Sequence, residues 1–427
     1  MTDIYLPTLH SGQIKIYRER DRLNAVRCGR RFGKTKLMVA IAANMAAKGK
    51  KVGLFTPEYK QLLEPWKECK AILKPVIDTA SKNEGQMTTV NGGLIDIWST
   101  NDNELAGRGR EYDEVLLDEA AFSKAPDMLQ EIWPKSIKPT MLTRRGRAWA
   151  FSTPKGVDPD NFFWAACNDP KLEFKQHHAP TSANPYVPPD ELEKERLSNH
   201  PLVFKQEFLA EFVDWSGVAF FASDKWMGED GLPLPWPDKC DSVFATVDTA
   251  VKDGKEHDGT AVIFWAVSRY HGAPLMILDW DIVQIEGAML ETWLPTIYQR
   301  LEQLAAVCGA RMGSLGAFIE DKASGTILLQ QATRRGWPAT PIDSKLTAAG
   351  KDEGAISISG YHYTGQVKLS APAHDKVTMF KGQTRNHLMT QVLGYRIGDK
   401  DAHKRADDLF DAYRYGVSIA LGDSNGY

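Results

Sequence analysis

The first residues with chemical potential form a short run, RCGRRFGKT, at residues 27–35. Its last three residues match the end of a phosphate-binding loop, in which a lysine such as Lys34 contacts phosphate and a hydroxyl such as that of Thr35 contacts Mg²⁺. The first glycine of that pattern is replaced by Cys28, and Gly29 comes one residue late. An apolar strand before the loop and an Ala-rich helix after it would point backbone N–H groups at an anion. The run therefore predicts a nucleotide site, against the alternative of a basic turn at a helix start.

Two apolar strands further along the chain end in polar residues that suit this chemistry. EVLLDEA places Asp118 and Glu119 at the end of one strand, and AWAFSTP ends the other in Ser152 and Thr153. In ATPases with a phosphate loop, an aspartate here holds Mg²⁺ and a catalytic residue orients the attacking water. The alternatives are two exposed acids and a simple strand-to-loop turn. Together the motifs predict an ATPase that binds ATP and Mg²⁺, with Thr153 beside the nucleotide.

Carboxylates also end two strands and begin the last helix expected in the second half of the chain. They are Asp248, Glu320, Asp321, Asp407, Asp408 and Asp411, with Asp253 and Asp258 as secondary candidates in a nearby loop. Two-metal nucleases hold two divalent ions, Mg²⁺ or Mn²⁺, with carboxylates from separate elements. Neighbouring strand side chains point to opposite faces, so we expect only one of Glu320 and Asp321 to face the metals. Each acid alone also fits a turn or a helix N-terminus, but the set predicts a metal-dependent nuclease.

The elements that must position these residues differ between the two halves of the chain. Strands alternate with helices in the first half, which predicts an α/β domain with a parallel-core sheet and ligands at the carboxyl ends of its strands. In the second half, three successive strands and then a helix–strand–helix–strand order are typical of an RNase H-like nuclease fold with a mixed sheet. We expect residues 1–213 to form the ATPase domain, with a helical linker region at about 180–213, residues 214–240 to form a linker, and residues 241–427 to form the nuclease domain.

Length and composition limit the remaining possibilities. A chain of 427 residues is long enough for two domains with separate cores. A formal net charge of -3 excludes a uniformly basic coat for nucleic acid, so DNA contact must come from local patches such as the basic run at residues 135–156. Five cysteines without a CxxC pair argue against a zinc site and a disulfide framework, and indicate a reducing compartment. No apolar run approaches the ~20 residues that span a bilayer, so we expect a soluble intracellular protein without membrane contact.

The order of these motifs resembles the large terminase subunit of tailed bacteriophages over nearly the whole chain. LHSGQ and GRRFGKT resemble that family's adenine motif and altered phosphate loop, VLLDEAA its Mg²⁺-and-glutamate strand, and FSTPKG its coupling motif. VDTA, IEDKASG and ADDLFDAYRYG resemble its three nuclease motifs. The family often has a histidine just before the paired acids of the last motif. This chain has Ala406 there, with His403 further back, which puts histidine participation in doubt.

The resemblance implies a role for each matching residue. In the nucleotide site these are Gln13 at adenine, Gly29, Arg30, Arg31 and Gly33 in the loop, Lys34 and Thr35 at phosphate and Mg²⁺, Asp118 at the ion's water shell, Glu119 as catalytic base and Thr153 in the coupling element. The implied nuclease ligands are Asp248, Glu320 or Asp321, and Asp408. Arg30 or Arg31 would stabilise transition-state charge. An arginine from a neighbouring subunit is the alternative, with Arg108, Arg110, Arg144, Arg145 and Arg147 as candidates.

The implied function is an ATP-driven motor that moves double-stranded viral DNA into a procapsid and cuts concatemeric DNA. The implied partners are the portal protein, a small terminase subunit and further copies of this chain in a ring, often a pentamer, in the host cytoplasm. Two alternatives stay open. A host-type repair helicase–nuclease would need further helicase motifs and usually a second motor domain, which we do not find. An NTP-dependent DNA-binding assembly module would carry an inactive nuclease.

Overall fold

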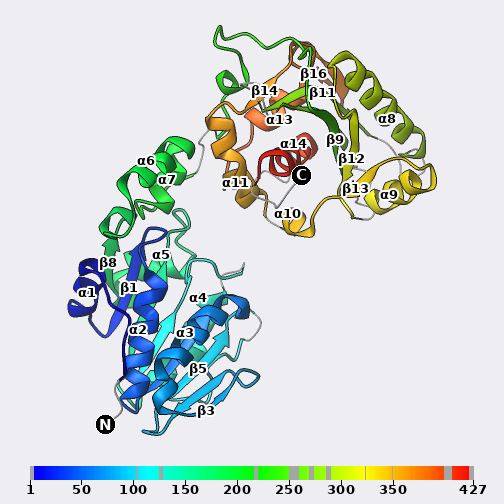
Figure 1. The fold of residues 1–427 in the computed structure, drawn as a ribbon. Helices are drawn as coiled ribbons and strands as arrows, with labels where there is room; N and C mark the ends of the chain where they lie inside the picture. The colour runs from blue at the N-terminus through cyan, green and yellow to red at the C-terminus, as the bar shows by residue number, and fades with distance from the viewer. Residues whose placement is uncertain are drawn as a thin grey trace. The chain divides into compact units, whose positions relative to one another are not determined.

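The computed structural model describes residues 4–101, 104–124, 128–215, 220–249, 259–268, 274–284, 290–322, 324–348, 350–398 and 406–422. The chain divides into two compact units, each with its own sheet (Figure 1). The first unit comprises Met1–Arg196 and Pro201–Asp214, and the second comprises Leu197–His200 and Trp215–Tyr427.

The first unit is built on an eight-stranded sheet with the order β3-β4-β5-β2-β6-β7-β1-β8. Its strands are β1 (Leu23–Cys28), β2 (Lys51–Thr56), β3 (Ile77–Ser81), β4 (Gln86–Thr89), β5 (Leu94–Ser99), β6 (Glu114–Leu117), β7 (Arg147–Ser152) and β8 (Lys175–Ala179). The strands from β5 to β8 in that order are parallel, whereas β3 and β4 add an antiparallel edge. The core of the sheet is therefore parallel, as the sequence predicts, and the carboxyl ends of β1, β6 and β7 lie side by side.

Helices cover both faces of this sheet because successive strand residues point to opposite sides. The helices are α1 (Ser11–Arg18), α2 (Lys34–Ala47), α3 (Leu63–Leu73), α4 (Met128–Ile132), α5 (Phe162–Asn168), α6 (Pro189–Ser198) and α7 (Pro201–Glu207). Val26 and Leu116 share a core with α2 and α3 on one face. Ala25 and Val115, their neighbours in the chain, share a second core with α4 and α5 on the other face.

The second unit is built on a six-stranded mixed sheet with the order β13-β12-β9-β10-β11-β14. Its strands are β9 (Ser242–Thr249), β10 (Thr260–Val267), β11 (Leu275–Val283), β12 (Ser314–Ile319), β13 (Ala339–Pro341) and β14 (Val367–Leu369), and β15 (Thr378–Phe380) pairs with β16 (Gln383–Arg385) in a separate hairpin. The strands β9, β10 and β11 are antiparallel, and β12 runs parallel to β9. Three antiparallel strands followed along the chain by helix, strand, helix and strand are the succession of elements that the sequence predicts.

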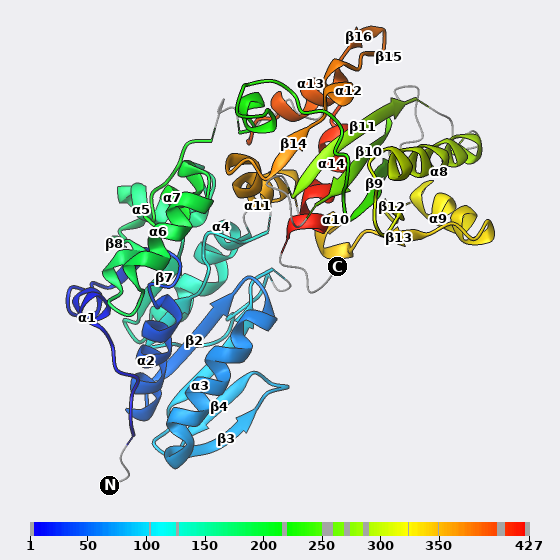
Figure 2. The ribbon, with the colours of Figure 1, turned by 45° about the horizontal axis from the view of Figure 1, so that its top comes forward.

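Helices also cover both faces of the second sheet (Figure 2). They are α8 (Leu290–Val307), α9 (Ser324–Arg334), α10 (Ser344–Ala348), α11 (Lys351–Tyr363), α12 (Ala371–Asp375), α13 (His387–Leu393) and α14 (Asp408–Leu421). On one face α8 and α9 pack on the strands. On the other face, Gly416 of α14 lies so close to the Trp265 ring that a Cβ would come within 2.3 Å of it. Thr246 Oγ1 also donates to the carbonyl of Ala412 at 2.8 Å, so α14 is fixed against β9 and β10.

Apart from Asp214, which belongs to the first unit, the described part of segment 214–240 belongs to the second unit. It contains a single helical turn, η7 (Ser223–Trp226). Trp226 is fully buried and its Nε1 donates to the Tyr413 hydroxyl at 3.3 Å. Trp236 Nε1 donates to the carbonyl of Leu278 at 2.9 Å. Among the described residues, no helix is both long enough and apolar enough to cross a membrane.

Candidate functional sites

The phosphate loop lies between β1 and α2, and its shifted glycine has a packing reason. Cys28 is the last residue of β1 and is completely buried, and burial raises the pKa of its thiol to about 12. A Cβ on Gly29 would come within 2.4 Å of Thr181 Oγ1 and 2.5 Å of the Phe208 carbonyl oxygen. Glycine is therefore needed at position 29 because the chain from β8 onward approaches the loop closely. Gly33 precedes α2 with φ 98°, which is a second position that favours glycine.

Two side chains at the start of α1 bind the loop carbonyls. His10 Nδ1 accepts from the Gly12 N–H, so the other ring nitrogen, Nε2, donates to the Phe32 carbonyl at 2.9 Å. Gln13 Nε2 donates to the Gly33 carbonyl at 2.8 Å, and Gln13 Oε1 accepts from the His10 N–H at 3.0 Å. Gln13 lies in a helix and beside the loop, while its contact with adenine stays a prediction. His10 was missed because a lone histidine carries no motif.

The lysine and the acids of the predicted nucleotide site meet at the carboxyl edge of the sheet. Lys34 is buried, and its Nζ donates to the carbonyls of Cys28 and Gly29 at 3.3 and 3.4 Å. Asp118 follows β6, where burial and the nearby charge of Glu119 raise its pKa to about 7, against the effect of Lys34. A hydroxyl from the exposed Thr35 and the carboxylate of Asp118 are oxygen ligands of the kind that Mg²⁺ prefers.

Ser152, at the end of β7, is the FSTP residue that contacts Glu119. Glu119 has φ 47°, in the left-handed region, which turns the chain sharply after the strand. Ser152 Oγ donates to Glu119 Oε2 at 3.4 Å and accepts from the Ala121 N–H at 3.2 Å. Thr153 is buried next to it. Sequence reasoning chose Thr153, whereas strand alternation alone would have allowed either residue.

The two loop arginines have different surroundings. The Arg30 side chain pairs through Nε with Glu207 Oε2 at 2.5 Å. The backbone N–H of Arg30 also donates to the backbone carbonyl of Glu207 at 2.7 Å. Arg31 is exposed with φ 60°, and its carbonyl accepts from Asn184 Nδ2 at 2.6 Å. Glu207, at the end of α7, was not found from the sequence because it lies far along the chain from the loop. Which arginine faces the γ-phosphate stays a prediction.

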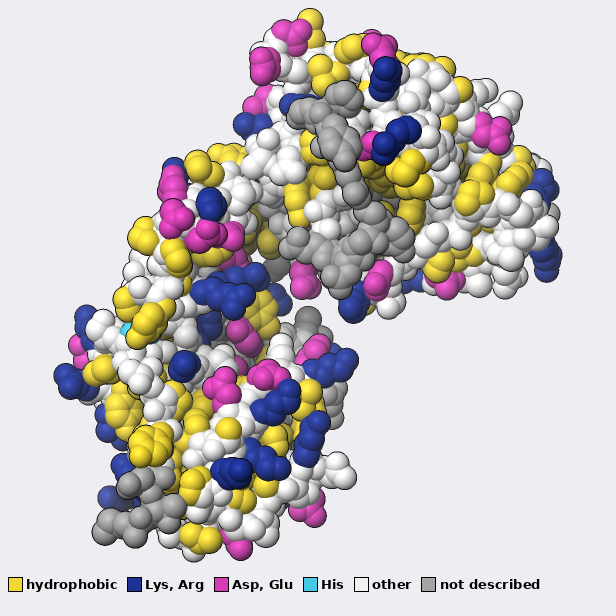
Figure 3. Space-filling model, in the orientation of Figure 1, with side chains coloured by type: hydrophobic (Ala, Val, Ile, Leu, Met, Phe, Trp, Pro, Cys, Tyr) yellow, Lys and Arg dark blue, Asp and Glu magenta, His cyan; other side chains and the backbone are white. Residues whose placement is uncertain are grey.

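Five arginines were predicted as candidates to reach the nucleotide site of a neighbouring subunit. Three of them form ion pairs with acids of the first unit. The pairs are Arg110 with Asp96, Arg144 with Glu111 and Asp113, and Arg147 with Glu114. Arg108 and Arg145 are exposed. In the basic run at 135–156, Lys135 also pairs with Glu131. Figure 3 likewise shows Lys and Arg side chains interspersed with Asp and Glu on the visible face of this unit.

The acids of the second unit come together at the start of α14. Asp248 lies near the carboxyl end of β9, Glu320 directly follows β12, and Asp408 and Asp411 occupy the first turn of α14. All four are buried. Asp248 hydrogen-bonds Glu320, and burial together with the charges of Asp411, Glu320 and Asp408 raises the pKa of Asp248 well above its ordinary value. Glu320 Oε1 also accepts from Lys322 Nζ at 2.6 Å and from the Tyr415 hydroxyl at 3.1 Å.

Two other predicted acids have different environments. Asp321 is exposed and its carboxylate accepts from Thr326 Oγ1 at 2.7 Å, so Glu320 is the member of the pair that lies beside Asp248. Asp407 contacts Lys351. The secondary candidates Asp253 and Asp258 lie outside the described residues, as does His403.

The acids of this cluster are suitable ligands for a divalent cation, but their side chains do not yet converge on one point. Buried carboxylates are the oxygen ligands that Mg²⁺ and Mn²⁺ take. Within the described residues, however, no three Asp, Glu, His or Cys side chains already converge as metal ligands. Asp411 explains part of this, since its two oxygens face Arg414 Nε at 2.5 Å and Lys351 Nζ at 2.9 Å. The donor set therefore fits a divalent cation once carboxylates turn toward it.

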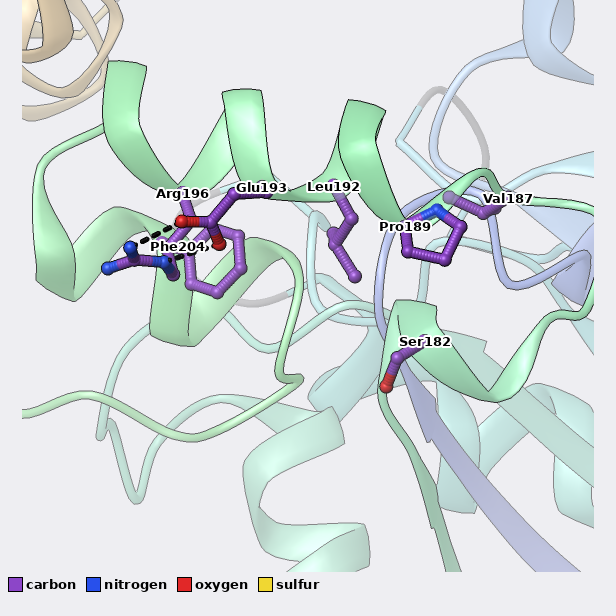
Figure 4. A pocket seen from close by; sticks show the side chains of 7 residues that line it. All are labelled: Ser182, Val187, Pro189, Leu192, Glu193, Arg196 and Phe204. Atoms are coloured by element: carbon purple, nitrogen blue, oxygen red, sulfur yellow. Dashed lines mark hydrogen bonds and ion pairs between the residues drawn. The ribbon is translucent and has the colours of Figure 1, made fainter.

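The first unit also contains a pocket of about 220 Å³ (Figure 4). Its lining residues come from α6, α7 and the segment before them, and they are Ser182, Val187, Pro189, Leu192, Glu193, Arg196 and Phe204. An ion pair of 2.5 Å joins Arg196 to Glu193 at its wall. None of the predicted site residues lines this pocket, so it belongs to the helical region of the first unit.

Comparison with known proteins relates this chain to large terminase subunits of bacteriophages. No family model matches the chain. The large terminase subunits of Thermus phage G20c and Thermus virus P23-45 are each 32% identical over 137 residues, which cover 27% of this chain. A large terminase structure from a thermophilic bacteriophage matches with TM-score 0.65 and 11% identity, covering 97% of this chain and 100% of that chain. The chain resembles phage large terminases in sequence and in fold.

The predicted resemblance and fold class are thereby confirmed. The same thermophilic phage's large terminase in complex with ATP-gamma-S matches with TM-score 0.62 and 12% identity, covering 96% of this chain and 98% of that chain. The likeness in fold to phage large terminases therefore extends over both units of this chain. The chain matches about a quarter of the length of the two Thermus phage relatives, 26% of each.

Proposed function

We propose that this chain is an ATP-driven motor that moves double-stranded DNA into a procapsid and cuts it with a two-metal endonuclease. The observation that carries the proposal is the presence of two separate reactive sets. Lys34, Asp118 and Glu119 meet at one sheet edge of the first unit, and four buried acids meet at the start of α14 in the second. The thermophilic phage terminase, which shares this fold, has been solved with ATP-gamma-S and with ADP, which supports nucleotide binding by the first unit.

In the ATPase half of the proposal, each group has one task. The loop N–H groups bind phosphate oxygens, and the Lys34 amine exchanges the carbonyls of Cys28 and Gly29 for phosphate. Thr35 would bind Mg²⁺ directly and Asp118 would bind it through the ion's water shell, and the ion would neutralise phosphate charge. Glu119 orients the attacking water, and Ser152 positions Glu119 through its hydroxyl. Arg30 or Arg31 stabilises the charge that develops on the γ-phosphate.

In the nuclease half, Asp248, Glu320 and Asp408 would hold the divalent ions. The chemistry that such ions would supply is activation of a water and stabilisation of the leaving 3′ oxygen. The carboxylates are close enough to raise the pKa of Asp248, so loading a cation favours loss of the proton from this residue. Tyr415 and Lys322 hold Glu320 in place through its Oε1 atom.

The proposed partners follow from packaging. Double-stranded DNA is the substrate, and the portal protein, a small terminase subunit and further copies of this chain complete the machine. A ring of copies, such as a pentamer, would couple hydrolysis to DNA movement. Arg108 and Arg145 are the arginines that we propose for contact with a neighbouring nucleotide site. Both are exposed and neither pairs with an acid among the described residues, whereas Arg110 and Arg144 are exposed and do pair with acids.

Plasmid cleavage with Mn²⁺ tests the nuclease half. Wild type should nick and linearise the plasmid, and Asp248→Ala should lose this activity. Asp321→Ala is the matched control, because Asp321 is exposed and bonded to Thr326, and it should cut like wild type. Failure of wild type to cut, or full cleavage by Asp248→Ala, would contradict the assignment and favour an assembly module with an inactive nuclease.

A further inference from the structure

Lys351 stands where the start of α11 meets the start of α14. It is the first residue of α11, and its ammonium contacts Asp407 and lies 2.9 Å from Asp411 Oδ2. A cation in the first turn of a helix is opposed by the helix dipole. The helix that carries Lys351 therefore does not account for a cation at this position, whereas the acids of α14 do.

Asp411 uses both carboxylate oxygens to bind cations, and the two cations differ in mobility. Oδ1 accepts from Arg414 Nε at 2.5 Å. The Arg414 side chain is only 7% exposed and is fixed by bonds to the Leu346 carbonyl and the Tyr415 hydroxyl. A Cβ on Gly354 would come within 2.9 Å of it, so there is no room for Arg414 to move that way. The Lys351 side chain is 42% exposed and flexible, so Oδ2 is the oxygen that can be released.

The other side of the cluster has a different charge environment. Asp248 hydrogen-bonds Glu320 and is acted on by the negative charges of Asp411, Glu320 and Asp408. Like charges that lie this close repel one another, and a cation placed among them removes the repulsion. A first divalent ion therefore gains most beside Asp248, where the negative charges repel one another, and least beside Asp411, where two protein cations already bind.

We propose that Lys351 is a positioning residue that serves as a resident counter-cation for the acids at the start of α14. A first divalent ion binds beside Asp248, Glu320 and Asp408. A second ion reaches Asp411 only when the Lys351 ammonium is displaced, which makes loading of the two ions sequential. This inference rests on the proposed nuclease function and assigns a role to a residue outside its metal ligands.

Binding of Mn²⁺ to the full-length protein without nucleotide tests the inference. Free Mn²⁺ is measured by electron paramagnetic resonance during titration of wild type, Lys351→Met and Lys345→Met. Lys345 is the matched control because it is an exposed lysine of the neighbouring helix α10. We expect wild type to bind one ion tightly and a second weakly, and Lys351→Met to tighten the second ion by roughly tenfold. Lys345→Met should bind both ions like wild type.

Thermal unfolding and a charge-preserving variant give independent readouts. Without divalent ions, Lys351→Met should melt below wild type, and Mn²⁺ should raise its melting temperature by more than it raises that of wild type. Lys351→Arg keeps the charge, so its second ion should bind as weakly as that of wild type. Equal second-ion affinity in Lys351→Met and wild type overturns this inference alone. Absence of any Mn²⁺ binding by wild type overturns the nuclease proposal as well.

Discussion

The two candidate sites hold their reactive groups in opposite ways. In the first unit, apart from the ion pair of Arg30 with Glu207, backbone geometry and hydrogen bonds to uncharged groups position the side chains: Lys34 donates to two carbonyls, and Ser152 donates to Glu119. In the second unit, ion pairs position the acids, since Lys322 pairs with Glu320 and both Lys351 and Arg414 pair with Asp411.

This difference follows from the ligand that each site is proposed to take. A loop that binds a polyanion presents N–H groups and a lysine, which carbonyl oxygens can satisfy before the ligand arrives. A cluster that binds cations consists of buried carboxylates, which repel one another unless cations stand nearby. Changes of shape should therefore damage the first site most, and changes of charge should damage the second.

The close approach at Gly29 provides the largest expected effect on stability. Gly29→Ala places a Cβ within 2.4 Å of Thr181 Oγ1 and 2.5 Å of the Phe208 carbonyl, so the loop or its neighbours must move. We expect the free energy of unfolding of the first unit to fall by about 1–3 kcal/mol. Chemical denaturation measures this, with Gly350→Ala as the control because a Cβ there has no neighbour within 4 Å. A Gly29→Ala protein that is as stable as wild type and binds ATP normally would contradict the claim that the first site is sensitive to changes of shape.

The hydroxyl of Ser152 provides the next effect, on rate. Ser152→Ala removes the bond to Glu119 Oε2 and the acceptor for the Ala121 N–H. Steady-state phosphate release should fall by about tenfold, because Glu119 loses a positioning contact, while ATP affinity should persist. Thr153→Val tests the neighbouring residue in the same assay. A larger loss in Thr153→Val than in Ser152→Ala would return the role to the residue predicted from the sequence.

The smallest expected effect concerns His362 of α11, a buried histidine whose ring contacts Tyr413 of α14. Burial lowers the pKa of His362 from 6.5 to about 4, and the ring bonds the Tyr413 hydroxyl and the backbone of Ala222. Between pH 4 and pH 6.5, the unfolded chain binds more protons at this residue than the folded chain does. The contribution of neutral, buried His362 to the stability of the folded state is therefore complete above pH 6.5 and declines as the pH falls.

His362→Gln lacks this titration, so the stability difference between wild type and the variant should narrow on acidification. We expect this difference in the free energy of unfolding to narrow by about 1 kcal/mol between pH 6.5 and about pH 5. Thermal unfolding of both proteins at each pH measures it. Asp224, Lys225 and His200 also act electrostatically on His362 and remain in both proteins. A constant difference across this range would show that His362 is not the group that titrates.

Motif spacing predicted which residues meet because sheet topology carries that information. Lys34 and Asp118 follow parallel strands, and the carboxyl ends of parallel strands share one edge of the sheet. Strand alternation predicted that only one of Glu320 and Asp321 faces the metals and left open which one, and the structure places Glu320 beside Asp248. The antiparallel edge formed by β3 and β4 was missed, since half-exposed Thr and Ser residues replace the apolar signal there.

The partners of the predicted residues required the structure. Glu207 pairs with Arg30 across 177 positions of the chain, and no local pattern indicates such a contact. Lys351 likewise approaches Asp407 across 56 positions, from a helix that the sequence analysis did not identify. The sequence therefore identifies groups that react, whereas the groups that orient or neutralise them appear only when the fold brings distant segments together.

The most direct test of the central claim is a pair of assays on two isosteric variants. Glu119→Gln and Asp248→Asn are each measured for ATP hydrolysis and for Mn²⁺-dependent plasmid cleavage. We expect Glu119→Gln to lose ATP hydrolysis and still cut DNA, and Asp248→Asn to lose DNA cleavage and still hydrolyse ATP. Loss of both activities in either variant, or loss of neither, would contradict two separate active sites in this chain.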